Sequence, residues 1–305
     1  SVIYTNLVIL FISRVISGIF SSYRSVCMAS LSDLSMSEQE RSKIYGTIST
    51  IGGMSWIFSM ICGGVFSELM GMSIPFFITT VLSFLSLIIV LVFYTDIYCP
   101  RKSDVKKRKT PVLSFQGNKK LTSLYVFYML LMVGWGINLL WLNPYVLSVF
   151  SPASITLYAL LVSTGFLWSV GSYWVNRMLI SKYCSKTITA YGLIGLIISF
   201  IGCSMSRSIE FFALFGAMAS LFGSISWTNA LNLISISAPQ DCQGKALGFT
   251  QSFGSVSLVL APVIAGGIAS KNILFVYPSA TLVTLGALCL LGFIYNTKDS
   301  YAQLS

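Results

Sequence analysis

Charged residues are scarce in this sequence: Asp, Glu, Lys and Arg make up only 9% of its 305 residues. A soluble globular domain carries about 25% charged residues, so this chain has too few to cover a surface that faces water. Hydrophobic residues make up 55% of the chain, and its mean hydropathy is +0.82. These values predict an integral membrane protein with the lipid bilayer as its solvent. A nucleic-acid partner is excluded despite the net charge of +10, because most of that charge lies in one short segment.

Histidine is absent, which excludes an imidazole base and histidine-ligated metals. The seven cysteines are widely spaced and include no C-x-x-C pair, which is typical of small buried hydrophobic residues rather than of a disulfide framework. They are Cys27, Cys62, Cys99, Cys184, Cys203, Cys242 and Cys289. With no paired intramembrane carboxylates and no nucleophile motif, the sequence predicts no enzyme, no catalytic residue, no metal site and no cofactor.

Long apolar runs dominate the chain. A bilayer core about 30 Å thick needs about 20 mostly apolar residues in helical form. Nine such runs are present, at residues 7–31, 46–69, 74–95, 122–149, 153–175, 187–206, 210–235, 245–269 and 273–294. We therefore predict an all-α membrane protein with nine transmembrane helices.

One polar segment, residues 96–121, interrupts these runs. Its eight cations are Arg101, Lys102, Lys106, Lys107, Arg108, Lys109, Lys119 and Lys120. The Lys/Arg bias of cytoplasmic loops assigns this segment to the cytoplasm. Successive spans then cross the membrane in alternating directions on either side of this segment. Seven further cations fall on the cytoplasmic side, namely Arg41, Lys43, Arg177, Lys182, Lys186, Lys245 and Lys298. Three fall on or near the outer side, namely Arg14, Arg207 and Lys271. We expect a solvated topogenic loop; binding of anionic lipids is the alternative.

Two segments of the chain match at a fixed offset of 202 residues. Arg41-Ser-Lys43-Ile-Tyr-Gly46 corresponds to Gln243-Gly-Lys245-Ala-Leu-Gly248, and the match continues at Gly52/Gly254, Ser55/Ser257 and Gly64/Gly266. Internal repeats of this kind are typical of transporters, whose site lies between the repeated halves. The second run matches the eighth. If three helices precede this sequence, these two runs become helices five and eleven, which a parallel repeat pairs in a bundle of two six-helix halves.

Arg14 followed four residues later by Gly18 is the first of several short motifs along the chain. It is similar to the fourth-helix motif of the major facilitator superfamily, and the resemblance is nearest to that family's drug:proton antiporters of the tetracycline-efflux type. Ala29-Ser-Leu-Ser-Asp33 with Arg41 resembles the loop between helices four and five. Ser59-Met60-Ile-Cys-Gly63-Gly64 stands where the antiporter signature has Gly-Pro-x-x-Gly-Gly, and Ala261-Pro262-Val-Ile-Ala265-Gly266-Gly267 is its second-half counterpart. Gly171 with Asn176-Arg177 resembles the loop motif between helices eight and nine.

The resemblance implies a major-facilitator-type bundle equivalent to helices 4–12 of twelve. Residues 1–95 would form a partial N-terminal half of three helices, 96–121 a basic cytoplasmic linker, and 122–305 the C-terminal six-helix half. The sequence starts at Ser1 rather than Met, and we expect it to be a piece of a longer chain. A monomer in a plasma membrane or bacterial inner membrane is implied.

Arg14 is a candidate cavity residue, because a cation at membrane depth costs at least about 2.5 kcal/mol and must face a cavity, a partner or the interface. Snorkelling to the headgroups is the alternative, and it is the better explanation for Arg24. No Asp or Glu lies well inside any run. Since proton coupling usually requires an intramembrane carboxylate, such a group is expected in the preceding helices, or transport is independent of protons.

Aromatic and amide side chains supply the other candidates for a solute cavity. Trp135, Asn138 and Trp141 share one broad helix face, and Pro144 follows them where it frees a backbone carbonyl. Asn229, Asn232 and Gln251 supply further amides at membrane depth. Such a set suits an amphipathic small-molecule solute. Interhelical hydrogen bonding and an outer aromatic belt are the alternatives.

Small residues let helices approach closely, so Gly18, Gly63, Gly64, Gly266 and Gly267, together with Pro144 and Pro262, are expected to serve packing and conformational change. The function predicted is a secondary transporter that moves a small solute by alternating access. Multidrug efflux by proton antiport is the first alternative. A non-transporting membrane scaffold or sensor, or a truncated product, is the second.

Overall fold

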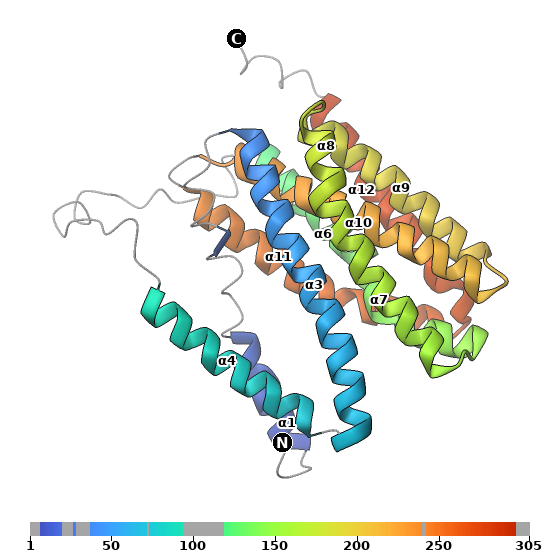
Figure 1. Cartoon of the computed structure of the whole chain (residues 1–305). Helices are drawn as coiled ribbons and strands as arrows, with labels where there is room; N and C mark the ends of the chain where they lie inside the picture. The colour runs from blue at the N-terminus through green and yellow to red at the C-terminus, as the bar shows by residue number, and fades with distance from the viewer. Residues whose placement is uncertain are drawn as a thin grey trace. The chain divides into compact units, whose positions relative to one another are not determined.

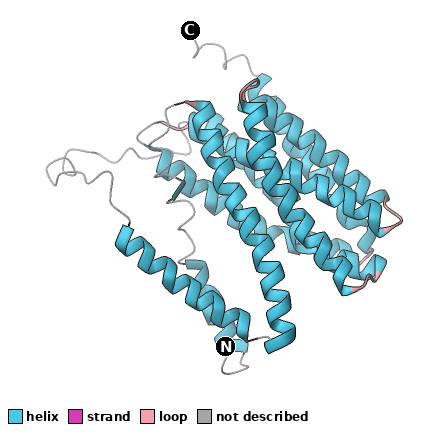
Figure 2. Cartoon of the chain, in the orientation of Figure 1, coloured by secondary structure: helices cyan, strands magenta, loops and turns pink. Residues whose placement is uncertain are grey.

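Helices account for all regular structure in the described residues. The computed structural model describes residues 7–19, 27–28, 37–71, 73–93, 119–239 and 242–296. Within these ranges no strand occurs, and the loops drawn pink in Figure 2 are short. The predicted all-α class is confirmed.

The helices follow the predicted apolar runs closely (Figure 1). Their bounds are α1 (Leu7–Ile19), α3 (Glu38–Met70), α4 (Ile74–Phe93), α6 (Lys119–Phe150), α7 (Ser154–Val170), α8 (Asn176–Ile180), α9 (Ser185–Met205), α10 (Ile209–Ser237), α11 (Gln243–Ala269) and α12 (Val276–Asn296). Within the described ranges, eight segments are long and apolar enough to cross a membrane, and α1 is a shorter apolar helix. The rest of the run predicted at 7–31 falls largely outside the described residues.

Helix α3 begins eight residues before the predicted run at residue 46. Its start is a capping box: the Ser37 Oγ accepts from the Glu40 backbone N–H at 3.2 Å, and the Glu40 carboxylate accepts from the Ser37 N–H at 3.1 Å. These bonds satisfy backbone donors that a helix start leaves without partners. The polar first turns of α3 are therefore helical, although hydropathy alone would start the span later, at residue 46.

Helices α7 and α8 form one continuous span from Ser154 to Ile180, joined by a π-helical turn at Gly171–Val175. The backbone stays in the right-handed helical region on both sides of the turn. A π turn inserts one extra residue into a helix and is frequent at functional sites. It carries the helix beyond the predicted end at residue 175.

The chain divides into two compact units. The first comprises residues 1–21 and 58–112, and the second comprises residues 22–57 and 113–305. The first unit includes α1, α4 and the C-terminal part of α3. The second includes the first part of α3 and all helices from α6 to α12. The division at 96–121 stays a prediction, because residues 94–118 lie outside the described ranges.

The second unit is a packed helical bundle. Within it α6 contacts α11 and α12, while α10 contacts α9 and α7. Apolar side chains also cover its outer surface; Val259 is 66% exposed and Phe293 is 67% exposed. An outer surface of this kind is stable in lipid and not in water.

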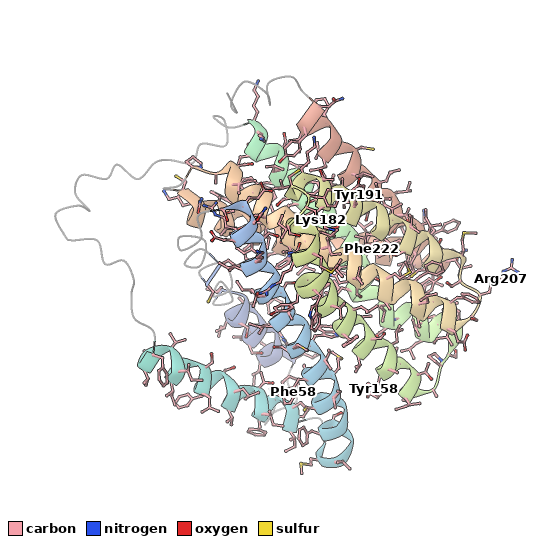
Figure 3. All side chains as sticks on the ribbon, turned by 45° about the horizontal axis from the view of Figure 1, so that its top comes forward. Phe58, Tyr158, Lys182, Tyr191, Arg207 and Phe222 are labelled. Atoms are coloured by element: carbon pink, nitrogen blue, oxygen red, sulfur yellow. The ribbon has the colours of Figure 1, made fainter. Side chains whose placement is uncertain are left out.

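The described cations of this unit lie at the ends of its helices. In Figure 3, Lys182 and Arg207 lie at opposite ends of α9, because one precedes Ser185 and the other follows Met205. The predicted orientation assigns the Lys182 end to the cytoplasm. Below, this end of the second unit is called its cytoplasmic end.

Candidate solute-binding site

A pocket of about 250 Å³ lies inside the second unit. It is built from the first part of α3 and from α6, α7, α10 and α11. The lining residues are Ser49, Gly52, Gly53, Trp56, Met132, Trp135, Asn138, Leu139, Leu142, Leu161, Thr164, Gly165, Trp168, Ser220, Trp227 and Leu258. Its largely apolar lining with a few polar groups is typical of small-molecule sites, and its volume lies just below their usual range of about 300–1,000 Å³.

Four tryptophans dominate the pocket. The ring centroids of Trp135 and Trp168 are 4.8 Å apart, and those of Trp168 and Trp227 are 6.2 Å apart. Trp168 Nε1 donates to Ser49 Oγ at 2.8 Å, and Trp227 Nε1 donates to the Tyr128 hydroxyl at 3.1 Å. These bonds and ring contacts fix the indole orientations, so the pocket offers rigid aromatic surfaces to a solute.

The amide of Asn138 is the most specific polar group of the pocket. Asn138 is only 2% exposed, and its Oδ1 accepts from the Tyr277 hydroxyl at 3.3 Å. Tyr277 is fully buried, and its ring contacts Tyr145 and Phe212 edge-on at 4.8 and 5.3 Å. The aromatic packing therefore holds the Tyr277 hydroxyl against one side of the amide.

Charge is missing from the described lining of the pocket. None of its lining residues is Asp, Glu, Lys or Arg. The described residues also include no group of three or more His, Cys, Asp or Glu side chains that could hold a metal ion. Recognition in this part of the site therefore depends on shape, aromatic contact and neutral hydrogen bonds.

Helices α3 and α7 approach very closely beside the pocket. A Cβ atom added at Gly165 would lie 3.1 Å from the Gly53 carbonyl oxygen, and one added at Gly53 would lie 3.0 Å from the Gly165 carbonyl oxygen. Thr50 Oγ1 and Ser172 Oγ are 3.0 Å apart one turn further on. Glycine is required at this crossing because the two backbones occupy the space of any side chain.

Toward the cytoplasmic end, Ser42, Asn176 and Asn229 form a closed hydrogen-bond triad. Ser42 Oγ donates to Asn229 Oδ1 at 3.2 Å, and Asn229 Nδ2 donates to Asn176 Oδ1 at 2.7 Å. Asn176 Nδ2 closes the triad by donating to Ser42 Oγ at 3.1 Å and to the Ser42 carbonyl oxygen at 3.2 Å. All three side chains are fully buried. The triad ties α3 to α8 and α10 without a buried charge.

A second group of bonds surrounds Glu38 and Asn232 at the same end. Glu38 Oε1 accepts from the Ser185 backbone N–H at 2.7 Å, at the start of α9, where a helix favours negative charge. Asn232 Nδ2 donates to the Glu38 carbonyl oxygen at 3.0 Å and to Ser185 Oγ at 2.7 Å. The triad and this group together are called the cytoplasmic clamp below.

The clamp and the pocket are built on the same helices. Along α3, Ser42 precedes the pocket residue Ser49 by a rise of about 10 Å, since each residue adds 1.5 Å. On the α7–α8 span, Trp168 lies in the pocket and Asn176 in the clamp, with the π-helical turn between them. The clamp thus lies between the pocket and the cytoplasmic end of the bundle.

The structure separates the predicted cavity residues into two groups. Trp135 and Asn138 line the pocket. Asn229 and Asn232, predicted for the cavity, lie instead in the clamp, where helix-to-helix hydrogen bonds use their amides. Gln251 is half-buried on α11, outside the lining.

The remaining predicted residues lie outside the pocket lining. Trp141 contacts the position of Gly266, where an added Cβ would be 3.5 Å from its ring. Pro144 and Pro262 lie inside α6 and α11 without ending them. A Cβ atom added at Gly267, Gly63 or Gly18 would meet no atom within 4 Å in the described part of the chain.

Two further predicted residues are in the first unit: Gly64 lies on α3, and Arg14 is exposed on α1. Their roles stay predictions, as do the packing roles of the other glycines and of the two prolines. Arg24 and the loop motif at 29–33 lie outside the described residues.

Several residues of the site belong to a pattern of small residues that a hydropathy analysis does not detect. Ser42, Gly46, Ser49 and Gly53 recur at helical spacing along α3, and Gly165, Ser169, Ser172 and Asn176 recur along the facing span. Two such stripes of small residues predict a close helix crossing. Trp168 had no such signal, because its place in the pocket depends on a contact with a distant helix.

The second unit is thus a bundle of helices that are long and apolar enough to span a membrane, and it encloses a solute-sized pocket. The chain matches the family described as Major Facilitator Superfamily over residues 1–210. It therefore belongs to this superfamily, and it is an integral, multi-pass membrane protein.

Solved structures agree with this assignment at the level of the fold. The human organic anion transporter MFSD10 (TETRAN) is similar with a TM-score of 0.77 and 15% identity, covering 95% of this chain and 72% of that one. FucP in its outward conformation is similar with a TM-score of 0.65 and 12% identity, covering 90% and 72%. A variant of the E. coli fucose:proton symporter FucP gives 0.69 and 12%, covering 90% and 73%. No curated protein matches the chain by sequence.

Proposed function

We propose that the protein is a secondary transporter that binds a small solute in the tryptophan-lined pocket and releases it by alternating access. The observation that carries the proposal is the sharing of α3, the α7–α8 span and α10 by the pocket and the cytoplasmic clamp. Breaking the clamp would open a path from the pocket to the cytoplasmic end, while the pocket residues stay on the same rigid helices. In this form of the molecule the clamp is closed.

The rocking of helices around a midplane site is the general mechanism of such bundles. The glycine crossing at Gly53 and Gly165 supplies a close, smooth contact about which the helices can move. Residues outside the described pocket lining are proposed to contribute to the same cycle. They are Arg14, Gln251 and the glycines expected to serve packing on α3 and α11.

Uptake into proteoliposomes tests the proposal. Candidate solutes are chosen from three classes: fucose, organic anions, and lipophilic cations as substrates of multidrug efflux. Replacing Trp135 with alanine is expected to lower the rate of uptake of any transported solute at least about tenfold, because a buried aromatic contact is lost. Trp174→Ala is the matched control, since Trp174 is 56% exposed on the outer surface and outside the pocket. Equal loss in the two variants, or no solute moved by the wild type, would contradict the proposal and favour a scaffold, a sensor or an incomplete product.

Proton coupling is tested in the same vesicles. We propose that any coupling carboxylate lies outside the pocket lining described above, because that lining contains none. Proton flux should therefore accompany solute transport only if a residue outside the pocket lining supplies the coupling carboxylate. Transport at a rate independent of pH, without proton flux, would exclude both antiport and symport with protons.

A further inference from the structure

Two hydrogen-bond donors of the pocket lack a partner among the described residues. Asn138 Oδ1 is engaged by Tyr277, whereas Asn138 Nδ2 has no hydrogen-bond partner among the described residues. The Trp56 indole nitrogen is buried and also has no partner there. The Trp56 N–H is an unpaired buried donor, which is costly, and a ligand that supplies an acceptor to either group gains a hydrogen bond.

The hydroxyl groups of the pocket do not change this excess of hydrogen-bond donors. Ser220 Oγ donates to the Gly216 carbonyl at 3.2 Å, and Thr164 Oγ1 donates to the Leu161 carbonyl at 2.7 Å, so their protons are bonded within their own helices. Ser49 Oγ already accepts from Trp168. The N–H groups of Asn138 are therefore the strongest unmet polar groups that the lining presents.

Tyr277 sets the direction of the Asn138 amide. Its hydroxyl donates to Oδ1 from behind the pocket wall, and its ring is packed among Tyr145, Phe200 and Phe212. Because Oδ1 is held on that side, the amide nitrogen remains for the pocket. Tyr277 lies outside the pocket lining, so its effect on a solute passes through Asn138.

We infer that the pocket selects an uncharged aromatic solute that presents a hydrogen-bond acceptor, such as a carbonyl oxygen, to Asn138, and that Tyr277 is the positioning residue for this contact. The inference rests on the proposed function and specifies its substrate class. The indoles of Trp135, Trp168 and Trp227 give the aromatic body of the solute its contact surface.

Electrostatics disfavours anions and cations as solutes of this pocket. An anion would lose its hydration in a pocket whose described lining holds no cation. A cation would gain from the tryptophan faces, but it would meet the positive ends of the unpaired N–H groups. An uncharged acceptor meets both the aromatic faces and the donors without either cost.

Four naphthalene probes of similar shape separate these chemistries in equilibrium binding to the purified full-length wild-type protein. They are 2-acetonaphthone (uncharged, with a carbonyl acceptor), 2-isopropenylnaphthalene (the same shape without an acceptor), 2-naphthoate (an anion) and 2-naphthyltrimethylammonium (a cation). We expect 2-acetonaphthone to bind about tenfold more tightly than 2-isopropenylnaphthalene, which corresponds to one net hydrogen bond. Both charged probes should bind at least about thirtyfold more weakly than 2-acetonaphthone.

Two variants and a control test the role of Tyr277. Asn138→Leu should reduce the tenfold preference for the carbonyl probe to about onefold. Tyr277→Phe keeps the buried ring and should reduce the preference to about threefold, since the amide is then free to turn. A purely structural effect would weaken both uncharged probes equally and leave their ratio unchanged. Thr281→Val is the control on the same helix, because the Thr281 hydroxyl bonds only its own helix at the Tyr277 carbonyl; it should preserve the ratio.

The outcomes separate this inference from the proposed function. Tightest binding of 2-naphthoate or of the ammonium probe, or a Tyr277→Phe variant with an unchanged ratio, would overturn the inference while transport stands. A wild-type protein that transports a solute but binds none of the four probes would overturn it as well. The expected ratios in a protein that moves no solute would instead contradict the proposed function. Unfolding temperatures of all variants identify any that fail to fold, and Tyr277→Phe is the variant that best preserves the packing.

Discussion

Replacing Gly165 with leucine is expected to abolish solute transport, with a loss of at least about a hundredfold. A Cβ atom at this position would lie 2.8 Å from Ile57 Cγ1 and 3.1 Å from the Gly53 carbonyl oxygen. The isoleucine can change its rotamer, but the backbone oxygen belongs to α3 and can yield only if the helix moves. Overpacking costs about 1–3 kcal/mol where side chains can adjust, and more where backbones must separate. The larger side chain therefore wedges α3 away from α7 and disrupts both the pocket and the crossing.

Two substitutions of different size at Gly165 test this expectation by their rates of solute uptake. Gly165→Ala should retain a measurable rate of uptake in proteoliposomes, about tenfold below wild type, and Gly165→Leu should fall to background. Gly248→Leu is the matched control, because an added Cβ at Gly248 meets no atom within 4 Å in the described part of the chain. Wild-type rates for Gly165→Leu, in protein that is correctly inserted, would show that the close crossing is not needed for transport.

Removing Asn229 from the cytoplasmic clamp is expected to open the cytoplasmic side of the pocket. Asn229→Leu takes away the acceptor of Ser42 and the donor to Asn176, and it leaves both partners buried. One unsatisfied group costs about 1–3 kcal/mol, which corresponds to a factor of about 5 to 150 in an equilibrium; with two such groups, the ratio of closed to open forms should fall by at least that factor. The measurement is alkylation of a cysteine introduced at Ser49 by a membrane-impermeant maleimide applied from the cytoplasmic side. Ser49 lines the pocket and is 2% exposed in the closed form, so its labelling rate should rise by the same factor.

An exposed amide provides the control for this experiment. Asn143 lies on α6 at the surface of the bundle, and Asn143→Leu should leave the labelling rate of the Ser49→Cys protein unchanged. Site-resolved mass spectrometry distinguishes the introduced thiol from the seven natural cysteines. If labelling of the Asn229→Leu protein stayed at the control rate, the clamp would have to be regarded as helix packing alone.

The helices of this protein could be predicted from hydropathy because lipid imposes a nearly uniform rule on spanning segments. The run predicted at 187–206 corresponds to α9 at Ser185–Met205, and the run at 210–235 corresponds to α10 at Ile209–Ser237. The rule fails at the start of α3, where a capping box rather than hydropathy determines the helix boundary. Hydropathy also gives no sign of the π-helical turn, because one inserted residue leaves the apolar run unchanged.

The candidate site was harder to predict because a polar residue inside a membrane has two uses. Asn138 and Asn229 look alike in the sequence: each is an amide in an apolar helix near a tryptophan. Asn138 keeps its nitrogen for the pocket, whereas the Asn229 amide bonds Ser42 and Asn176 on neighbouring helices and the Ile225 carbonyl of its own helix. Only the partners distinguish the two, and these lie 139 residues from Asn138 and up to 187 from Asn229 along the chain. The same long range hides Trp168, whose ring is placed by Ser49 on α3.

The π-helical turn at Gly171–Val175 has a consequence for comparisons among relatives of this chain. A π turn contains one residue more than the α-helical path between the same two ends. A relative with an uninterrupted α-helix must therefore be aligned with a one-residue gap inside 171–175. Without the gap, every position toward Ile180 would be rotated by about 100° around the helix axis. Asn176, a clamp residue and part of the degenerate loop motif, would then be paired with a residue that faces another direction. A family alignment that passes through this helix without a gap would therefore align Asn176 with a residue that is not its structural equivalent.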